Sequence, residues 1–533
     1  MQTLDLIIIF GYLIGVTAFG VWFSGRQKTT ENYFVGDRSV PWWAIAMSIV
    51  ATETSTITFI SVPGIAFAKG GNFQFLQLVM GYMLGRIVIS LLFIPMYFRG
   101  ELQTVYQLLG ERFGNRVKML ASALFVIMRN IADGIRLLLT AIVLAAVYTA
   151  FKPETPVETV VIGSVILLGV VMIIFTYYGG MEAVIWVEVV QLLIYVGGAV
   201  AAAVVIAQQV DGGFSGAMAL GSEFDKFNFI DWGIRETRYF MPVPFTSSGI
   251  GFSLPLDLTK TFTFWAGAIG GCFLTMSTHG TDQYLVQRYL CTNKPKSASV
   301  ALLTSGAVVF AQFIGFLIIG VLLFAFYQPF ENPGYQAAAT GSAFPFPGGD
   351  TVFPDFITKS MPSGLSGLVV AAIFAAALSS SLNSIAATFV NDLYRPFSPA
   401  ADDRKLLRLS HWLTLIFGIV QIVVALAVMK QQRSALDSAL SVASLINGPV
   451  LGVFLVGTFL KRAKERHALV GMIVSIVLMS FLLYVEFSKR FGLVPSATPI
   501  AWPWYVLIGS SVTFLVTCLA TVLLSPKRNE IKA

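Results

Sequence analysis

The 533-residue chain has little charge, because Asp, Glu, Lys and Arg together make up only 12% of it. Soluble domains contain about 25% of these residues. Hydrophobic residues make up 56% of the chain, and its mean hydropathy is +0.77. This composition excludes a soluble globular protein. It also excludes a disordered chain, which needs low hydrophobicity and a high net charge.

Cysteine and histidine are also scarce. Three Cys cannot build a disulfide framework or a Cys-rich metal site, and the three His lie too far apart in sequence to favour a His-based metal site. The formal net charge of +7 comes from basic residues that lie between apolar runs rather than in one patch. They indicate the positive-inside bias of a membrane protein rather than a nucleic-acid partner.

Apolar segments long enough to cross a bilayer recur along the whole chain. In hydrocarbon each backbone polar group must be satisfied within its own segment, so these segments predict helices. The chain is therefore predicted to be an all-α polytopic membrane protein with about thirteen transmembrane helices. The predicted spans are 4–24, 41–66, 72–98, 119–150, 158–178, 182–207, 261–287, 298–327, 364–390, 409–429, 435–460, 467–486 and 503–525.

The charges of the connections predict the orientation. Lys and Arg are concentrated in alternate connections, such as residues 112–118, 404–408 and 461–466. Cytoplasmic loops carry this excess. We therefore expect a multi-pass protein of the plasma (inner) membrane with its N-terminus outside, its C-terminus in the cytoplasm and Arg288 in a cytoplasmic connection. The first run has no basic n-region or cleavage site, so it predicts a span rather than a signal peptide.

The second predicted span contains an unusual polar stretch. Six of the seven residues from 52 to 58 are polar, and one of them is the ionisable Glu53. Ser and Thr compete with helical hydrogen bonding. The stretch therefore favours a broken helix, whose freed carbonyls bind a cation and whose hydroxyls bind a solute. The alternative is a hydroxyl-rich seam between packed helices.

The ninth span places Ser379, Ser380 and Ser381 in a row after a run of alanines. Hydroxyl and carbonyl oxygens supply neutral ligands that suit Na⁺, without the charge of a Ca²⁺ site. The alternative is simple packing of small residues.

Charged residues interrupt two further spans. Arg129, Asp133 and Arg136 can share one face of the fourth span, either as self-neutralising pairs or with one arginine left for a substrate. Glu188 lies well inside the sixth span and needs a cation, a basic partner or a proton. The seventh span is polar near Asp282 and Gln283, as the second is near Glu53. Paired interruptions of this kind point to a site between inverted repeats.

Several motifs together resemble the sodium/solute symporter family, which includes the sodium–glucose, sodium–proline and sodium–sialic acid cotransporters. They occur in order at residues 33–44, 51–59, 179–188, 282–288 and 374–394. The resemblance implies an inverted five-helix-repeat core and Na⁺-driven alternating access. The implied organisation is a leading helix (4–24), repeat one (41–207), an outer loop (208–260), repeat two (261–460) and two trailing helices (467–525).

The resemblance also implies site residues. The main Na⁺ ligands match Ala51, Thr54, Ala376, Ser379 and Ser380. Ser381 competes as a ligand, because the stretch before Asn383 is about three residues shorter than in many relatives, and Glu188 matches an aspartate of a second sodium site. Arg136 matches an arginine that holds the carboxylate in acidic-sugar carriers. The predicted substrate-binding residues are Glu53, Ser55, Thr58, Arg136, Asp282 and Gln283.

The expected function is coupled uptake of Na⁺ and a small polar solute, namely a sugar, an acidic sugar, a polyol or an amino acid. One alternative is Na⁺-coupled uptake of a carboxylate. Another is coupling of uptake to protons, through Glu53 or Glu188, instead of to Na⁺. A channel or sensor agrees less well with the sequence, because no repeated carbonyl selectivity filter and no ring of charged residues is evident. An enzyme would need a nucleophile with a base in reach, and no such group is evident.

Overall fold

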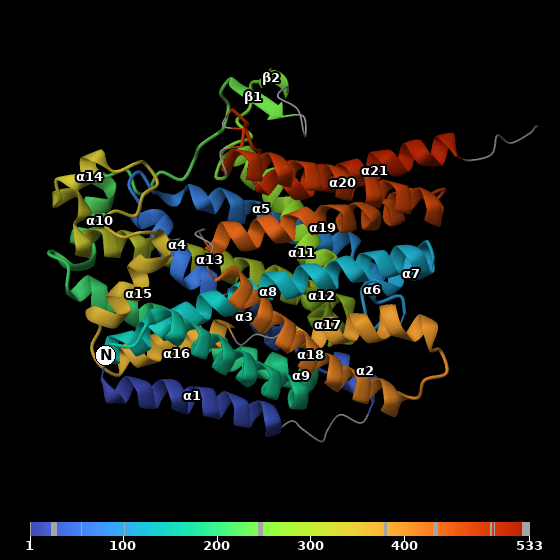
Figure 1. Cartoon of the computed structure of the whole chain (residues 1–533), viewed down its shortest axis with the longest axis horizontal. Coiled ribbons are helices and arrows are strands. Elements are labelled where there is room, and N and C mark those ends of the chain that lie inside the picture. The colour runs from blue at the N-terminus through green and yellow to red at the C-terminus, as the bar shows by residue number, and fades with distance from the viewer. Residues whose placement is uncertain are drawn as a thin grey trace, which may run out of the picture.

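A computed structural model describes residues 2–22, 29–54, 56–100, 102–152, 154–242, 249–377, 381–429, 435–490, 493–494 and 496–524. These residues form a helical bundle with one antiparallel hairpin, so the predicted helical character is confirmed (Figure 1). The hairpin pairs β1 (Thr237–Pro242) with β2 (Gly249–Leu254). A backbone hydrogen bond of 3.0 Å from Thr498 to Phe240 attaches it to the segment before the last helix.

The helices of the first half, including short 3₁₀ and π elements, follow the predicted spans closely. They are α1 (Thr3–Trp22), α2 (Thr30–Val35), α3 (Trp42–Glu53), α4 (Thr56–Phe67), η1 (Phe73–Phe75), α5 (Leu76–Leu92), α6 (Ile94–Tyr97), α7 (Gln107–Arg112), α8 (Asn115–Phe151), α9 (Val157–Gln208) and α10 (Gly213–Glu223).

The second half repeats this pattern of long helices and short ones. Its elements are η2 (Ala266–Gly271), α11 (Cys272–Gly280), α12 (Gln283–Leu290), α13 (Pro295–Tyr327), η3 (Pro329–Glu331), α14 (Gly334–Ala337), α15 (Gly349–Lys359), α16 (Leu365–Ala377), α17 (Leu382–Thr388), η4 (Phe389–Tyr394), η5 (Arg395–Phe397), α18 (Asp403–Val428), α19 (Ala435–Phe459), α20 (Glu465–Arg490) and α21 (Pro503–Leu523).

The outside of the bundle is apolar. Leu193 is 62% exposed and Val522 is 77% exposed, as expected for side chains that face lipid. Seven helices within the described ranges are long and apolar enough to cross a membrane, and the bent pair α3–α4 makes an eighth. Every predicted span overlaps at least one helix. The number of thirteen crossings stays a prediction.

Three predicted spans are divided between two helices, and two others share one kinked element. The axes of α3 and α4 differ by 60°, with Thr54 between them in a non-helical conformation (φ −83°, ψ 79°). The seventh span is interrupted at Thr281 and Asp282, between α11 and α12. The ninth is divided between α16 and α17. The fifth and sixth spans form one element, α9, which kinks at Gly180, where φ is +62°. Glycine is the residue that adopts this conformation without steric cost.

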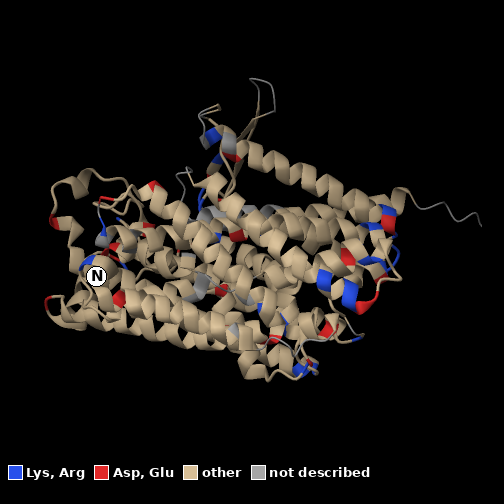
Figure 2. Cartoon of the chain, turned by 60° about the horizontal axis from the view of Figure 1, so that its bottom comes forward, with Lys and Arg blue, Asp and Glu red and all other residues tan. Residues whose placement is uncertain are grey.

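The two ends of the bundle differ in character. The N-terminus, α10, α14 and α15 lie together at one end, which we call the loop end (Figure 1). Lys and Arg gather mainly at the opposite end (Figure 2). This distribution follows the loop charges from which the orientation is predicted. Arg288 differs from the prediction, because its side chain in α12 is fully buried rather than in a connection.

Two lysines fasten the loop-end terminus of α4. The Lys69 ammonium donates to the carbonyls of Tyr335, Gln336 and Ala338 at 3.0, 2.7 and 2.9 Å. The Lys226 ammonium donates to the carbonyls of Phe67 and Ala68 at 3.2 and 2.7 Å. Cations are favourable at a helix C-terminus, where the carbonyls are unpaired. Both long loops are thereby attached to the second half of the broken helix.

Lys226 is expected to make stability depend on pH. Burial lowers the pKa of its ammonium from 10.5 to about 7, so the folded protein binds fewer protons than the unfolded chain between these values. The free energy of unfolding should therefore rise with pH, by about 2 kcal/mol between pH 7 and 9. Thermal unfolding of the wild type and Lys226→Met from pH 6 to 9 checks this. The stability of the wild type relative to Lys226→Met should increase toward pH 9. The control Lys152→Met, which changes an exposed lysine, should show the same pH dependence as the wild type. Parallel wild-type and Lys226→Met curves would contradict it.

Candidate functional site

The break between α3 and α4 is the centre of the candidate site. Ala51 and Thr54 lie at the C-terminal end of α3, and both are buried. The last carbonyls of a helix lack intrahelical partners and carry partial negative charge, so this end favours a cation. The Thr54 hydroxyl donates to Gln312 Oε1 of α13 at 3.0 Å. Thr58 is buried in the first turns of α4, and Ser55 lies outside the described residues.

The break lies beside the ninth span. The Thr56 hydroxyl, at the start of α4, donates to the Ile373 carbonyl of α16 at 3.0 Å. It also accepts a hydrogen bond of 3.1 Å from Thr140 of α8. Ala376 belongs to the last turn of α16, which ends at Ala377. Ser379 and Ser380 lie outside the described residues, and the description resumes at Ser381, before α17.

Glu188 forms an ion pair with a basic residue. Its carboxylate lies 2.5 Å from Arg288 Nη2 of α12, and both side chains are almost completely buried. It also accepts hydrogen bonds from Ser48 and, at 3.1 Å, from Thr52 of α3. The hydrogen bonds from Ser48 and Thr52 join α9 to α3, which is the first half of the broken helix. The predicted role of Glu188 as a Na⁺ ligand stays a prediction.

The charged residues of the fourth span meet Ser381. The Ser381 hydroxyl donates to Asp133 Oδ2. Arg129 Nε and Arg136 Nη2 lie 3.9 and 3.8 Å from Asp133 oxygens, too far for good hydrogen bonds. Asp133 Oδ1 and Arg136 Nη1 are buried and have no hydrogen-bond partner among the described residues. The cluster is therefore neutralised in charge but incompletely hydrogen-bonded, and Arg136 retains a donor for another group.

The seventh span contributes two further predicted residues. Asp282 caps α12 by accepting from the Tyr284 backbone N–H at 2.8 Å, and it lies 3.7 Å from Arg129. Gln283 is fully buried, and its amide bonds to the backbone of Gln103 and Val105 at 2.9 and 2.8 Å. Asp282 therefore joins the Arg129 cluster, whereas Gln283 is held by a neighbouring loop.

Glu53 lies in a different cluster from Arg136. Its carboxylate pairs with Arg86 of α5 and lies 3.4 Å from His279 Nε2 of α11. Arg86 is fully buried, and its Nε and Nη1 have no hydrogen-bond partner within the described ranges. The negative charge that the sequence places in the second span is thus balanced inside the protein.

Four residues of this region are not predicted from the sequence as site residues, namely Arg86, His279, Gln312 and Tyr284. Arg129, Arg136 and Arg288 lie 4.2, 6.0 and 4.6 Å from the centre of the Tyr284 ring. A buried arginine inside an apolar span costs about 2.5–3.5 kcal/mol on insertion scales, and this cost is the signal that points to Arg86.

Comparisons with known proteins identify the family. The profile of the sodium:solute symporter family matches residues 33–475. The chain is 31% identical to the sodium/sialic acid symporter NanT of Aliivibrio fischeri, over 99% of this chain and 95% of that protein. It is also 31% identical to the sodium/sialic acid symporter SiaT of Proteus mirabilis, over 98% and 95% of the two chains.

A solved structure of a Na⁺-coupled sialic acid symporter, in a substrate-bound outward-open state, is similar over 98% of this chain and 99% of that chain. Its TM-score is 0.77 and its sequence identity is 30%. The predicted family is confirmed, and the members that match are transporters, not enzymes. The chain belongs to the sodium:solute symporter family.

Proposed function

We propose that this protein couples inward movement of Na⁺ to the uptake of an acidic sugar by alternating access. The observation that carries the proposal is the hydrogen bond between Thr56 and Ile373, which sets the α3–α4 break beside the ninth span. Two interrupted helices that meet within a bundle can share an ion between their ends. The names of the relatives NanT and SiaT supply the class of solute.

The Na⁺ ion would bind between these interruptions. Backbone oxygens of Ala51, Thr54 and Ala376 and the hydroxyls of Ser379 and Ser380 form the proposed ligand set. Ser381 is the alternative ligand for this ion, and Glu188 is proposed for a second ion. Both already have protein partners, Asp133 and Arg288, so an ion would have to compete with existing contacts.

The substrate would bind next to the broken helix. The free donor on Arg136 suits a carboxylate, because a guanidinium pairs with a carboxylate through charge-assisted hydrogen bonds. Glu53, Ser55, Thr58, Asp282 and Gln283 are proposed to contact the rest of the solute. Na⁺-coupled uptake of a simpler carboxylate or an amino acid is the second candidate, because Arg136 requires only a carboxylate.

The proposed architecture follows the same scheme. Residues 41–207 and 261–460 form two inverted repeats, after the leading helix 4–24 and before the trailing helices 467–525. The interruptions of α3–α4 and α11–α12 at the start of each repeat support this symmetry. The loop end faces outward, which places the basic end in the cytoplasm.

Uptake into proteoliposomes tests the function. Radiolabelled N-acetylneuraminate should accumulate above its external concentration when NaCl is outside and potassium is inside. Replacing Na⁺ by choline should remove accumulation, and an inside-negative potential should increase it. Accumulation that persists in choline and follows a proton gradient would overturn Na⁺ coupling. Equilibration without accumulation would indicate a channel.

A further inference from the structure

Two of the interrupted helices end close together inside the bundle. α3 ends at Glu53, immediately before the α3–α4 break, and α11 ends at Gly280, immediately before the interruption at Thr281 and Asp282. Glu53 Oε2 lies 3.4 Å from Nε2 of His279, the residue before Gly280. The carbonyls at a helix C-terminus carry partial negative charge, and the Glu53 carboxylate adds a full charge. A cation between the two ends therefore stabilises this arrangement.

Arg86 of α5 is that cation. Its Nη2 donates to Glu53 Oε2 and lies 3.3 Å from His279 Nε2. Arg86 is fully buried, and His279 is only 3% exposed. A single guanidinium nitrogen thus contacts both the last residue of α3 and the last turn of α11.

The ring of His279 accepts a hydrogen bond from Arg86. Its Nδ1 lies 3.0 Å from the Thr278 hydroxyl, and that hydroxyl donates to the Leu274 carbonyl at 3.1 Å. Because a hydroxyl has one proton, the proton between Thr278 and His279 belongs to Nδ1. The hydrogen-bond network therefore assigns the neutral ring, with Nε2 as the acceptor that faces Arg86. A chain of hydrogen bonds runs from Glu53 through Arg86 and His279 to the backbone of α11.

α5 packs closely against the first half of the seventh span. A Cβ on Gly81 would lie 2.0 Å from the Gly267 carbonyl oxygen, and a Cβ on Gly85 would lie 2.7 Å from the Cys272 carbonyl oxygen. Small residues let two helix backbones approach in this way. Arg86 follows Gly85 directly, so the guanidinium starts from a point where α5 and α11 are already in contact.

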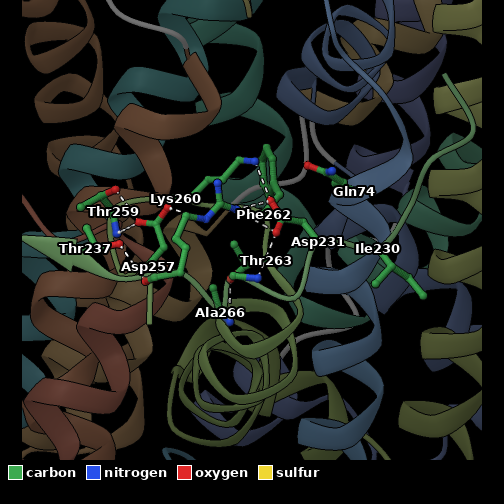
Figure 3. Close-up of polar contacts among 12 residues, drawn as sticks. Gln74, Ile230, Asp231, Thr237, Asp257, Thr259, Lys260, Phe262, Thr263 and Ala266 are labelled. Atoms are coloured by element: carbon green, nitrogen blue, oxygen red, sulfur yellow. Dashed lines mark hydrogen bonds and ion pairs between the residues drawn. The ribbon is translucent and has the colours of Figure 1, made fainter. Parts of the chain in front are cut away.

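The N-terminal ends of these two helices are fastened together. Gln77 of α5 donates to the Phe262 carbonyl at 3.3 Å and accepts from the Asp231 backbone N–H at 3.1 Å. Asp231 also pairs with Lys260 at 2.6 Å (Figure 3). The start of α5 and the start of the seventh span are therefore held at one place.

The C-terminal ends are joined as well. Tyr97 of α6 donates to the Gly280 carbonyl, at the point where α11 stops. A Cβ on Gly280 would lie 2.7 Å from the ring of Phe93, which directly follows α5. α5 and α11 are thus fixed to each other at both ends, and Arg86 attaches the pair to the last residue of α3.

We propose that Arg86 is a positioning residue that couples the Na⁺ site to the solute site. Na⁺ bound at the α3–α4 break fixes the end of α3. The contacts from Glu53 through Arg86 to His279 then fix the end of α11. Asp282, a proposed solute contact, lies two residues after that end. The inference rests on the proposed function, because it explains how the ion raises the affinity for the solute through a contact that both sites bias.

Binding of N-acetylneuraminate in NaCl and in choline chloride tests the proposal. The readout is the ratio of the two dissociation constants, measured by isothermal titration of the purified protein. We expect a ratio of at least about tenfold for the wild type and below about twofold for His279→Leu, which removes the acceptor but keeps Glu53 and Arg86. A purely structural defect would weaken binding in both salts alike and leave the ratio unchanged.

The double variant Glu53→Gln/Arg86→Met gives a second test that keeps His279. It removes both charges together, so no buried charge is left uncompensated. Its ratio should also fall below about twofold, because the link between α3 and α11 is lost. A ratio that stays at the wild-type value in either variant overturns the proposal.

Two control variants should keep the wild-type ratio. His279→Gln retains a side-chain acceptor for Arg86, and Ser90→Ala removes a hydroxyl one turn further along α5. Loss of the ratio in either control would mean that any change on these helices uncouples the two sites, and it would contradict the proposed role of the Arg86 contact.

The outcomes also separate this inference from the proposed function. A wild type that binds N-acetylneuraminate equally in the two salts overturns Na⁺ coupling itself. A wild type with the expected ratio, together with a His279→Leu variant that keeps it, overturns only the role of Arg86.

Discussion

Replacing Ser379 and Ser380 together by alanine is expected to abolish Na⁺-stimulated uptake while leaving the amount of folded protein unchanged. The substitution removes two of the five proposed ligand oxygens and leaves only the backbone oxygens. If each lost oxygen costs about 1.4 kcal/mol, the Na⁺ concentration for half-maximal uptake rises about a hundredfold. The measurement is the Na⁺ dependence of initial uptake rates in proteoliposomes.

Two helices of the ninth span flank these serines. The helix before them ends at Ala377 and the next begins at Leu382, and Ser379 and Ser380 themselves lie outside the described residues. That span is held against the break after α3 by the bond from Thr56 to Ile373. Ser381 differs, because its hydroxyl already donates to Asp133.

Two comparisons give this experiment its controls. Ser253→Ala/Ser480→Ala changes two exposed serines and should retain wild-type Na⁺ dependence. Ser381→Ala tests the alternative register of the ligands. An unchanged Na⁺ dependence in Ser379→Ala/Ser380→Ala, with the dependence lost in Ser381→Ala, would move the site by one residue. Unchanged dependence in both variants would refute it.

Substitution of Glu188 by glutamine is expected to destabilise the protein by about 3–5 kcal/mol. The change leaves Arg288 fully buried without its counter-charge, and an uncompensated buried charge is costly. Hydrogen bonds from Ser48 and Thr52 to the carboxylate would be weakened as well. The measurement is the yield of monodisperse protein together with its midpoint of thermal unfolding.

The double variant Glu188→Gln/Arg288→Met removes both charges and should recover most of the lost stability. It also distinguishes the two roles considered for Glu188. If the carboxylate only neutralises Arg288, the rescued protein keeps its Na⁺ dependence. If it binds a second ion, the rescued protein still folds, but its dependence on Na⁺ becomes less steep. No recovery of stability would contradict the ion-pair account.

The sequence predicts the broken helices well, because their cause is local. Residues 52–58 are too polar for a plain span, and the helix stops at Thr54 as expected. Pairing between distant charges is harder to predict. Glu188 and Arg288 are 100 residues apart, and only the fold brings α9 against α12. For the same reason, Arg288 is predicted in a connection although it is buried.

The candidate site divides in a similar way. Arg129, Asp133 and Arg136 form the cluster that their spacing on one helix predicts. The position of Glu53 opposite Arg86 and His279 depends on three separate helices and has no local signal. The hydrogen bond from the Val105 backbone N–H to Gln283 also joins distant segments and has no local signal in the sequence.

The central claim is that Na⁺ binds where the α3–α4 break meets the ninth span and thereby raises the affinity of the site for the solute. Isothermal titration of the purified protein with N-acetylneuraminate, in NaCl and in choline chloride, tests it most directly. We predict an affinity at least about tenfold higher in NaCl, and an equal gain in Na⁺ affinity when the solute is present, because coupling between two sites is reciprocal. Equal affinities in the two salts would contradict the claim.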